Sequence, residues 1–155
     1  MNTYTQILYQ IVFTPKNHEK TLIDENRQEL YKYIGGILKK KKCHLYRIGG
    51  VSDHIHIITH LHPIISLASI VKDIKVASST YIKNNNLFPM FSGWQDAWLP
   101  IRQGYGGFTY SIHDKDKLIE YVKNQEEHHK TKSFREELID LLNENGIVFD
   151  IKYMP

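Results

Sequence analysis

An alternating stretch from Asp53 to His62 constrains the fold more than any other part of this 155-residue chain. Histidine and isoleucine alternate at its start, as in a β-strand whose successive side chains point to opposite faces. His54 and His56 would then project from one face, with Cα atoms about 6.6 Å apart at a rise of about 3.3 Å per residue. Ile55 and Ile57 point to the other face and can join a hydrophobic core. The stretch therefore predicts a strand that presents two imidazoles on one side.

Two further histidines, His60 and His62, fall on the same face by strict alternation. His54 and His60 would lie about 20 Å apart, so a single metal ion can use the first pair or the second, not both. Neutral imidazole is a common metal ligand, and either pair has suitable spacing. The alternative is a solvated sheet face in a chain rich in histidine, and the pair alone does not decide between the two.

A second informative segment runs from Leu118 to His129 and has the periodicity of a helix. Tyr121 and Gln125 are one turn apart, so their side chains lie on the same face, at the edge of the apolar stripe. A side chain at that edge can point across the surface of a sheet toward a cleft. His128 lies on the same edge of the helix, about one turn after Gln125. The apolar stripe itself comprises Leu118, Ile119 and Val122.

The whole chain reads as one domain, residues 1–155, with the element order β-α-β-β-α-loop-β-α-α. Strands joined by a tight turn pair antiparallel, so we expect an α+β fold with the helices packed on one face of the sheet. The predicted strands span residues 6–14, 44–48, 54–62 and 107–112, with a turn at Gly49-Gly50. The predicted helices span 24–41, 67–83, 114–130 and 134–144, with Asp24, Ser66, Asp114 and Ser133 as caps.

The helix that follows Ser66 has two contrasting faces. One face carries three lysines within a narrow arc, namely Lys72, Lys75 and Lys83. Such a stripe is most often a solvated face, as is the lysine run 39–42, which complements the dipole at a helix C-terminus. The buried stripe is predicted to comprise Leu67, Ile70, Ile74, Ala77 and Tyr81.

Composition excludes some classes of protein and permits others. The single cysteine, Cys43, cannot form an intramolecular disulfide and suits a reducing cytoplasm. The chain has no apolar run long enough for a membrane span and no secretion signal near Met1. A net charge of +3 permits nucleic-acid binding without requiring it.

The two informative segments resemble those of a known enzyme family. His54-Ile55-His56 resembles the HUH motif, in which U is a bulky hydrophobic residue. Tyr121-x-x-x-Gln125 resembles the helix that carries the nucleophilic tyrosine and the third metal ligand in single-tyrosine HUH transposases, small insertion-sequence enzymes that act on single-stranded DNA. Further similar segments follow one another in the family's order along nearly the whole chain, at residues 33–38, 49–54, 103–108 and 124–129.

The resemblance implies a ferredoxin-like or RRM-like antiparallel sheet with the HUH strand near its centre. It also implies that Tyr121 attacks DNA to give a 5′-phosphotyrosine and a free 3′-OH, and that His54, His56 and Gln125 hold a divalent ion, Mg²⁺ or Mn²⁺. The lysine stripe then becomes a candidate contact to DNA phosphates, made by Lys72, Lys75 and Lys83.

The implied partners are single-stranded DNA, with hairpins at the element ends, and a second copy of the chain. In a homodimer, each active site would combine His54 and His56 of one chain with Tyr121 of the other. A compact monomer would instead place Tyr121 beside its own histidines.

One segment departs from the family pattern. In relatives, a Trp-Gln pair commonly leads almost directly into the Gly-Tyr-Gly segment, whereas here residues 96–102 separate Trp94-Gln95 from Gln103-Gly104-Tyr105. The resemblance therefore implies nothing about the path of this loop. Both tryptophans, Trp94 and Trp98, are expected in the core, with stacking on unpaired bases as the alternative.

Two other functions fit parts of the pattern. A non-catalytic nucleic-acid-binding module on an RRM-like sheet would need exposed aromatic side chains on its central strands. A zinc hydrolase would need a third strong ligand and a carboxylate base, for which Asp53 and Glu126 are the nearest candidates in the sequence.

Overall fold

The computed structural model describes residues 3–96 and 104–151. Over these ranges the chain forms one four-stranded antiparallel sheet of β1 (Leu8–Phe13), β2 (His44–Val51), β3 (His54–His60) and β4 (Gly106–Tyr110). The strand order is β2-β3-β1-β4, so β3 lies inside the sheet with a neighbour on each side. The α+β class and the central position of the HUH strand are thus confirmed.

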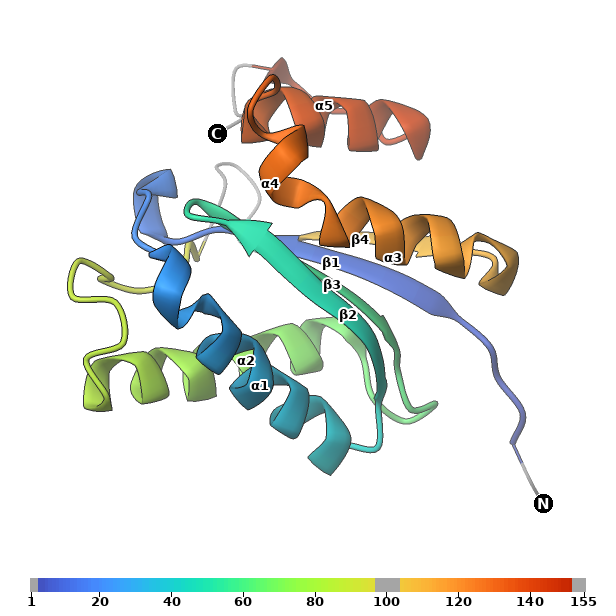
Figure 1. Ribbon diagram of the computed structural model, residues 1–155. Helices are drawn as coiled ribbons and strands as arrows, with labels where there is room; N and C mark the ends of the chain where they lie inside the picture. Colours follow the sequence, from blue (N-terminus) through green and yellow to red (C-terminus); the bar gives the residue numbers. More distant parts are fainter. Residues whose placement is uncertain (1–2, 97–103, 152–155) are drawn as a thin grey trace.

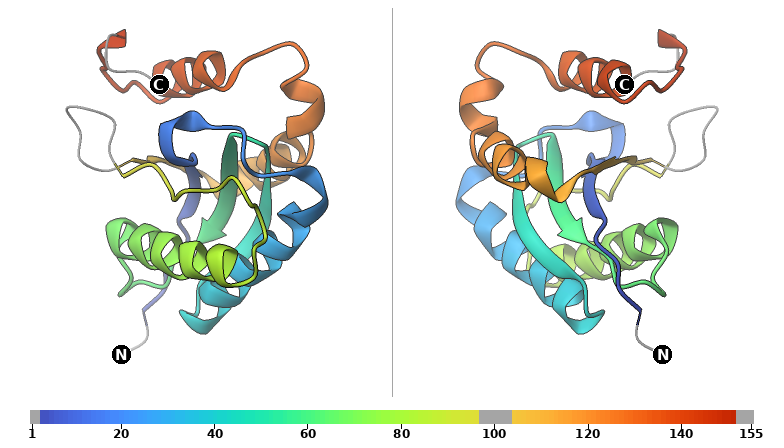
Figure 2. Two further views of the ribbon diagram at one scale, coloured as in Figure 1. Left: turned by 90° about the vertical axis from the view of Figure 1, so that its left-hand side faces the viewer. Right: turned by 90° about the vertical axis from the view of Figure 1, so that its right-hand side faces the viewer.

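Helices cover both faces of the sheet (Figures 1 and 2). On one face lie α1 (Asp24–Lys40) and α2 (Leu67–Asn84), and on the other lie α3 (Lys115–Lys123), α4 (Gln125–His128) and α5 (Phe134–Glu144). The expectation that helices pack on one face was wrong for the three C-terminal helices. The reason lies in the strands, because apolar side chains point to both sides: Ile55 and Ile57 contact the α1–α2 side, and Leu8, Val12 and Ile58 contact the α3–α5 side. Two short 3-10 helices, η1 (Lys16–His18) and η2 (Ile112–Asp114), complete the described elements.

The hairpin between β2 and β3 differs from the predicted one. Gly49 and Gly50 are not its turn but pair within the ladder, opposite His56 and Ile55. The turn is formed instead by Ser52 and Asp53. Because Asp53 ends this tight turn, it lies directly beside the first histidine of β3.

The predicted tyrosine helix is interrupted. Instead of one helix over 114–130, the chain forms α3 and α4 with a break at Asn124, and Asp114 makes no side-chain capping bond. The caps at Ser66 and Ser133 behave as expected, since Ser66 accepts a hydrogen bond from the Ser69 N–H and Ser133 accepts one from the Glu136 N–H.

The buried stripe of α2 is rotated from the predicted one. Ile70 and Ile74 are buried as expected, but Ala77 and Tyr81 are only partly covered and Ser78 is buried in their place. The cause is Trp94, which packs against α2 in the core and donates from its indole Nε1 to Ser78 Oγ at 2.9 Å. Trp94 is thus a core residue, as predicted, whereas Trp98 and residues 97–103 lie outside the described ranges. Leu67, like Ala77 and Tyr81, is partly buried.

None of the helices in the described part of the chain combines the length and the apolar character that a membrane span requires.

Candidate active site

The first histidine pair lies on the sheet face that α3, α4 and α5 cover. His54 and His56 are both fully buried, and their ring centroids are 5.0 Å apart. The second pair does not match this arrangement, because His62 lies beyond the end of β3 and His60 is bonded through Nδ1 to the main chain of Ile7. Of the two pairs, only His54 and His56 share a buried, enclosed position.

Each imidazole of this pair is oriented by an acceptor at its Nδ1. His54 Nδ1 donates to Asp53 Oδ1 at 2.7 Å, and His56 Nδ1 donates to Gln10 Oε1 at 2.8 Å. A carboxylate and an amide oxygen only accept, so both protons belong on Nδ1 and both Nε2 atoms face inward. Hydrogen bonds of this kind orient histidines that bind metals. Asp53, a candidate base from sequence, therefore acts as a support for His54.

Gln125 completes the expected ligand set. Its side chain is buried, and its Oε1 lies 2.9 Å from His54 Nε2. It follows Tyr121 by one turn across the break at Asn124, and its amide Nε2 still reaches back to the Tyr121 carbonyl oxygen at 3.5 Å. Two imidazole nitrogens and one amide oxygen converging in a buried site fit a divalent metal ion.

Tyr121 stands beside the same histidines, in its own chain. Its ring lies edge-on to His56, with 5.7 Å between centroids, and its side chain is partly buried. The hydroxyl donates to Glu137 Oε2. Burial, reinforced by the negative charge of Glu137, raises the pKa of Tyr121 well above its usual value near 10. The phenol therefore needs both a proton acceptor and a stabilised product to attack a phosphate.

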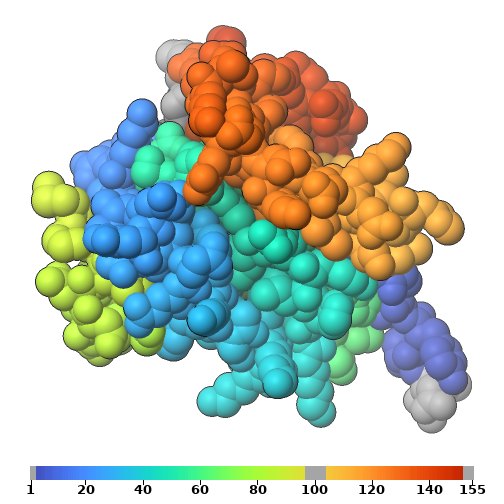
Figure 3. Space-filling view, in the orientation of Figure 1, coloured from blue at the N-terminus to red at the C-terminus, as the bar shows by residue number. Residues whose placement is uncertain are grey.

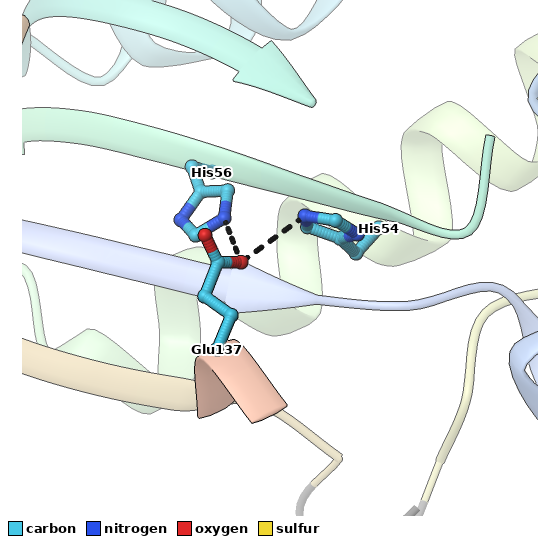
Figure 4. Close-up of side chains that lie close together, drawn as sticks. All are labelled: His54, His56 and Glu137. Atoms are coloured by element: carbon cyan, nitrogen blue, oxygen red, sulfur yellow. Dashed lines mark hydrogen bonds and ion pairs between the residues drawn. The ribbon is translucent and has the colours of Figure 1, made fainter. Parts of the chain in front are cut away.

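Glu137 is the functional candidate that sequence reasoning missed. It extends from α5 into the cluster, fully buried, with Oε1 at 2.9 Å from His56 Nε2 and 3.3 Å from His54 Nε2 (Figure 4). Burial favours its neutral form, but its interactions with His129, His54 and His56 outweigh burial and hold its pKa far below the usual range. The sequence does contain one indication of this role. Glu137 is a charged residue on the apolar face of α5, which is otherwise formed by Phe134, Leu138 and Leu141.

The two histidines of the pair differ in their affinity for protons. Burial alone would lower the pKa of His54, but its hydrogen bonds to Asp53 and Glu137 raise that pKa to about 9. Burial dominates at His56 and lowers its pKa despite the contact with Glu137. Of the two imidazoles, His54 therefore holds a proton more strongly than His56 does.

A pocket of about 330 Å³ opens on the exposed side of this cluster. Its wall includes Tyr121 and Glu137, so a substrate group in the pocket would lie next to the phenol. Other residues lining it are Gln10, Tyr110, Lys117 and His128. Glu126, the second carboxylate that sequence reasoning considered, is not part of this wall and pairs with Arg27 at 2.9 Å.

The three candidate lysines of α2 lie on the opposite side of the sheet from Tyr121 and are not equivalent. Lys72 and Lys83 are exposed. Lys75 is partly buried, and its ammonium donates to the main-chain oxygens of Gln95 and Gly104 at 2.7 and 2.9 Å. Burial lowers the pKa of Lys75 to about 8, with Asp96 opposing the shift. Lys75 therefore links the main chain at Gln95 to that at Gly104, whereas the other two lysines are available to a partner.

Comparison with known proteins identifies the family of this chain. Residues 3–125 match the family model described as "Transposase IS200 like". The chain belongs to the IS200-like transposase family. The match ends at Gln125, so it includes the histidine pair and Tyr121 of this transposase but neither His129 nor Glu137.

Solved structures show the same fold. The crystal structure of a protein from Deinococcus radiodurans R1 that is assigned as a transposase has a TM-score of 0.58 and 22% identity, over 81% of this chain and 95% of that one. A REP-associated tyrosine transposase bound to a REP hairpin also has a TM-score of 0.58, with 14% identity over 83% of this chain and 74% of that one. The comparison with curated proteins gives no match.

Proposed function

We propose that this transposase cleaves and rejoins single-stranded DNA at the ends of an insertion sequence through a covalent 5′-phosphotyrosine on Tyr121. The observation that carries the proposal is the position of Tyr121, whose ring packs on His56 while its hydroxyl contacts the carboxylate that touches both histidines. Family membership supports a DNA-processing enzyme. The hairpin bound to the REP-associated relative supports DNA with hairpins as the substrate.

His54, His56 and Gln125 are the residues that would hold a divalent ion, Mg²⁺ or Mn²⁺. Bound beside the scissile phosphate, such an ion would polarise the phosphorus and stabilise the charge that develops in the transition state. The three side chains are neutral ligands when His54 has lost its proton, so they leave the charge of the ion available to the phosphate.

The protein's own residues supply the nucleophile, Tyr121, and an acceptor for its phenolic proton, Glu137. Tyr121 Oη forms a bond to phosphorus and the bond from phosphorus to the 3′ oxygen breaks, which leaves a 5′-phosphotyrosine and a 3′-OH. The phenolic proton passes to Glu137 Oε2, the atom to which the hydroxyl already donates, and from there to the departing 3′ oxygen, which leaves as the 3′-OH. In the reverse direction a DNA 3′-OH attacks the phosphotyrosine and Tyr121 recovers its proton. The phosphodiester energy is conserved, so rejoining needs no ATP.

The binding-module alternative fits the structure less well. It requires exposed aromatic residues on the central strands, but β1 and β3 are buried along almost their whole length beneath helices on both faces. The zinc-hydrolase alternative requires a third strong ligand and a carboxylate base, and Glu137 is a carboxylate in contact with both histidines. A zinc hydrolase would not need Tyr121, so a requirement for Tyr121 distinguishes the proposed transposase chemistry from hydrolysis.

Covalent capture tests the proposal. The protein is incubated with a single-stranded hairpin oligonucleotide and Mn²⁺ and then separated on a denaturing gel. We expect a protein–DNA adduct with the wild type, no adduct with Tyr121→Phe, and equal hairpin binding by both. Cleavage without any adduct would favour a hydrolase, and binding without cleavage would favour the binding module.

We also propose a homodimer, since transposition requires two element ends to be held together and a two-fold dimer supplies two sites. Tyr121 lies beside the histidines of its own chain. We therefore infer that each subunit carries a complete site, in contrast to the composite sites that the family resemblance implies.

A further inference from the structure

A third imidazole reaches the same point as the HUH pair. His129 follows α4, one turn after Gln125, and its Nε2 lies 2.9 Å from Gln125 Oε1 and 3.2 Å from Glu137 Oε1. Its ring centroid is 4.5 Å from that of His54. The side chain is largely buried, with 9% of its surface exposed. His129 is therefore as close to the centre of the cluster as Gln125.

The hydrogen bond on the outer side of His129 determines which nitrogen faces inward. Its Nδ1 lies 2.7 Å from the main-chain oxygen of Lys132, which can only accept. The proton of a neutral His129 is thus on Nδ1, and the lone pair of Nε2 points into the cluster. His54 and His56 have the same arrangement, with Asp53 and Gln10 as their acceptors. When all three imidazoles are neutral, each presents an Nε2 lone pair to one point.

Two oxygen atoms that also only accept hydrogen bonds face this point. Glu137 Oε1 lies 3.3, 2.9 and 3.2 Å from the Nε2 atoms of His54, His56 and His129. Gln125 Oε1 lies 2.9 Å from the Nε2 atoms of His54 and His129. Lone pairs this close repel one another unless protons or a cation lie between them. Ligands bound about 2.0–2.2 Å from one ion are about 2.9–3.5 Å apart, which matches these separations.

We propose that His129 and Glu137 are metal ligands of this transposase and that they complete, with His54, His56 and Gln125, a site of three imidazoles, one carboxylate and one amide. The proposal rests on the proposed function, because it assumes that the HUH pair binds an ion. Imidazole-rich sites favour later transition metals such as Co²⁺, Ni²⁺ or Zn²⁺ over Mg²⁺. Glu137 would also link the ion to the nucleophile, since its Oε2 accepts from Tyr121.

Calorimetric titration with Mn²⁺ tests the two added ligands. We expect His129→Gln and Glu137→Gln each to weaken binding at least about tenfold, because even the loss of an outer hydrogen bond at such sites costs about 10- to 100-fold. His113→Gln is the matched control, since His113 is an exposed histidine of η2 outside the cluster, and it should bind as the wild type does. Circular dichroism and thermal melts establish that each variant is folded.

The remaining outcomes separate this proposal from the proposed function. If His54→Ala loses Mn²⁺ while His129→Gln and Glu137→Gln keep wild-type affinity, the HUH site stands and the two added ligands are refuted. If Glu137→Gln binds Mn²⁺ more tightly than the wild type, the carboxylate competes with the ion, and its role as a ligand is also refuted. If the wild type and His54→Ala are equally unable to bind Mn²⁺, the metal site of the proposed function fails.

A second measurement needs no variant. X-ray absorption of the wild-type protein loaded with Co²⁺ reports the number of imidazoles bound to the ion. We expect three, from His54, His56 and His129. A count of two would exclude His129 and overturn the proposal, even if the variants did not fold.

Discussion

Gly49 in β2 lies directly against the main-chain carbonyl of Val122 in α3. A β-carbon at position 49 would stand 2.5 Å from that oxygen and 2.9 Å from Val122 Cγ1. Figure 3 shows the surface of α3, in orange, resting on the teal surface of β2, and the two elements are packed along this interface. Because Val122 follows Tyr121 in the chain, the absence of a side chain at Gly49 sets the position of Tyr121 over the sheet.

Gly49→Ala should therefore impair catalysis more than folding. We expect the free energy of unfolding to fall by about 1–3 kcal/mol, as for other overpacked positions. Adduct formation should fall by up to about 100-fold, because a displacement near 1 Å can cost that much in rate. The control is Gly36→Ala, since no atom outside its own helix lies within 4 Å of the added carbon. That control should keep wild-type activity, and equal activity in Gly49→Ala would show that the close approach of β2 and α3 does not position Tyr121.

The raised pKa of His54 predicts how stability depends on pH without metal. Its pKa is about 9 in the folded protein and about 6.5 when unfolded, so the folded state holds the proton more tightly. The resulting stabilisation is complete below pH 6.5 and is lost as pH rises through 9. In EDTA we expect the Tm to fall between about pH 6.5 and pH 8, and to fall less in His54→Gln. The range stops at pH 8 because Lys75, with its pKa lowered to about 8, contributes with the opposite sign above it. Parallel curves for both proteins would contradict the assignment.

The exposed lysines of α2 should contribute salt-dependent DNA binding. For Lys72→Gln/Lys83→Gln we expect the slope of log affinity against log salt to fall by about one for each phosphate that the variant no longer neutralises. Lys75 is left unchanged because its ammonium donates to the main-chain oxygens of Gln95 and Gly104. A double variant at Lys39 and Lys40, two exposed lysines in the last turn of α1, is the control. Equal slopes in both double variants would mean that the stripe on α2 is only a solvated face.

Mixing two inactive chains tests whether each site is complete within one subunit. His56→Ala and Tyr121→Phe should each be inactive alone. Because Tyr121 packs on His56 of its own chain, we expect the mixed heterodimer to form no adduct. An adduct on the His56→Ala chain, in a sample shown to contain heterodimers, would place Tyr121 in the partner's site.

Local patterns are sufficient to predict part of the site. The alternation of β3 predicts that His54 and His56 share a face, and helical spacing predicts that Tyr121 and Gln125 lie together. Gly49 and Gly50 suggest a turn because glycine often marks one, while the actual requirement at Gly49 is the close approach of α3. No local pattern joins His56 to Glu137, which is 81 residues away in sequence. The one indication in the sequence is that Glu137 lies on the apolar face of α5. This indicates a buried carboxylate, but the sequence does not show that α5 covers the histidines.

Identification of the residue that carries the DNA is the sharpest test of the proposed mechanism. The wild-type protein is allowed to form its adduct with a single-stranded hairpin oligonucleotide and Mn²⁺, the complex is digested, and mass spectrometry locates the nucleotide-bearing peptide. Tyr110 is the main alternative site of DNA attachment, because it lines the same pocket as Tyr121. We expect a 5′-phosphotyrosine at Tyr121 alone. A nucleotide on Tyr110, on any other residue, or on none would refute the mechanism.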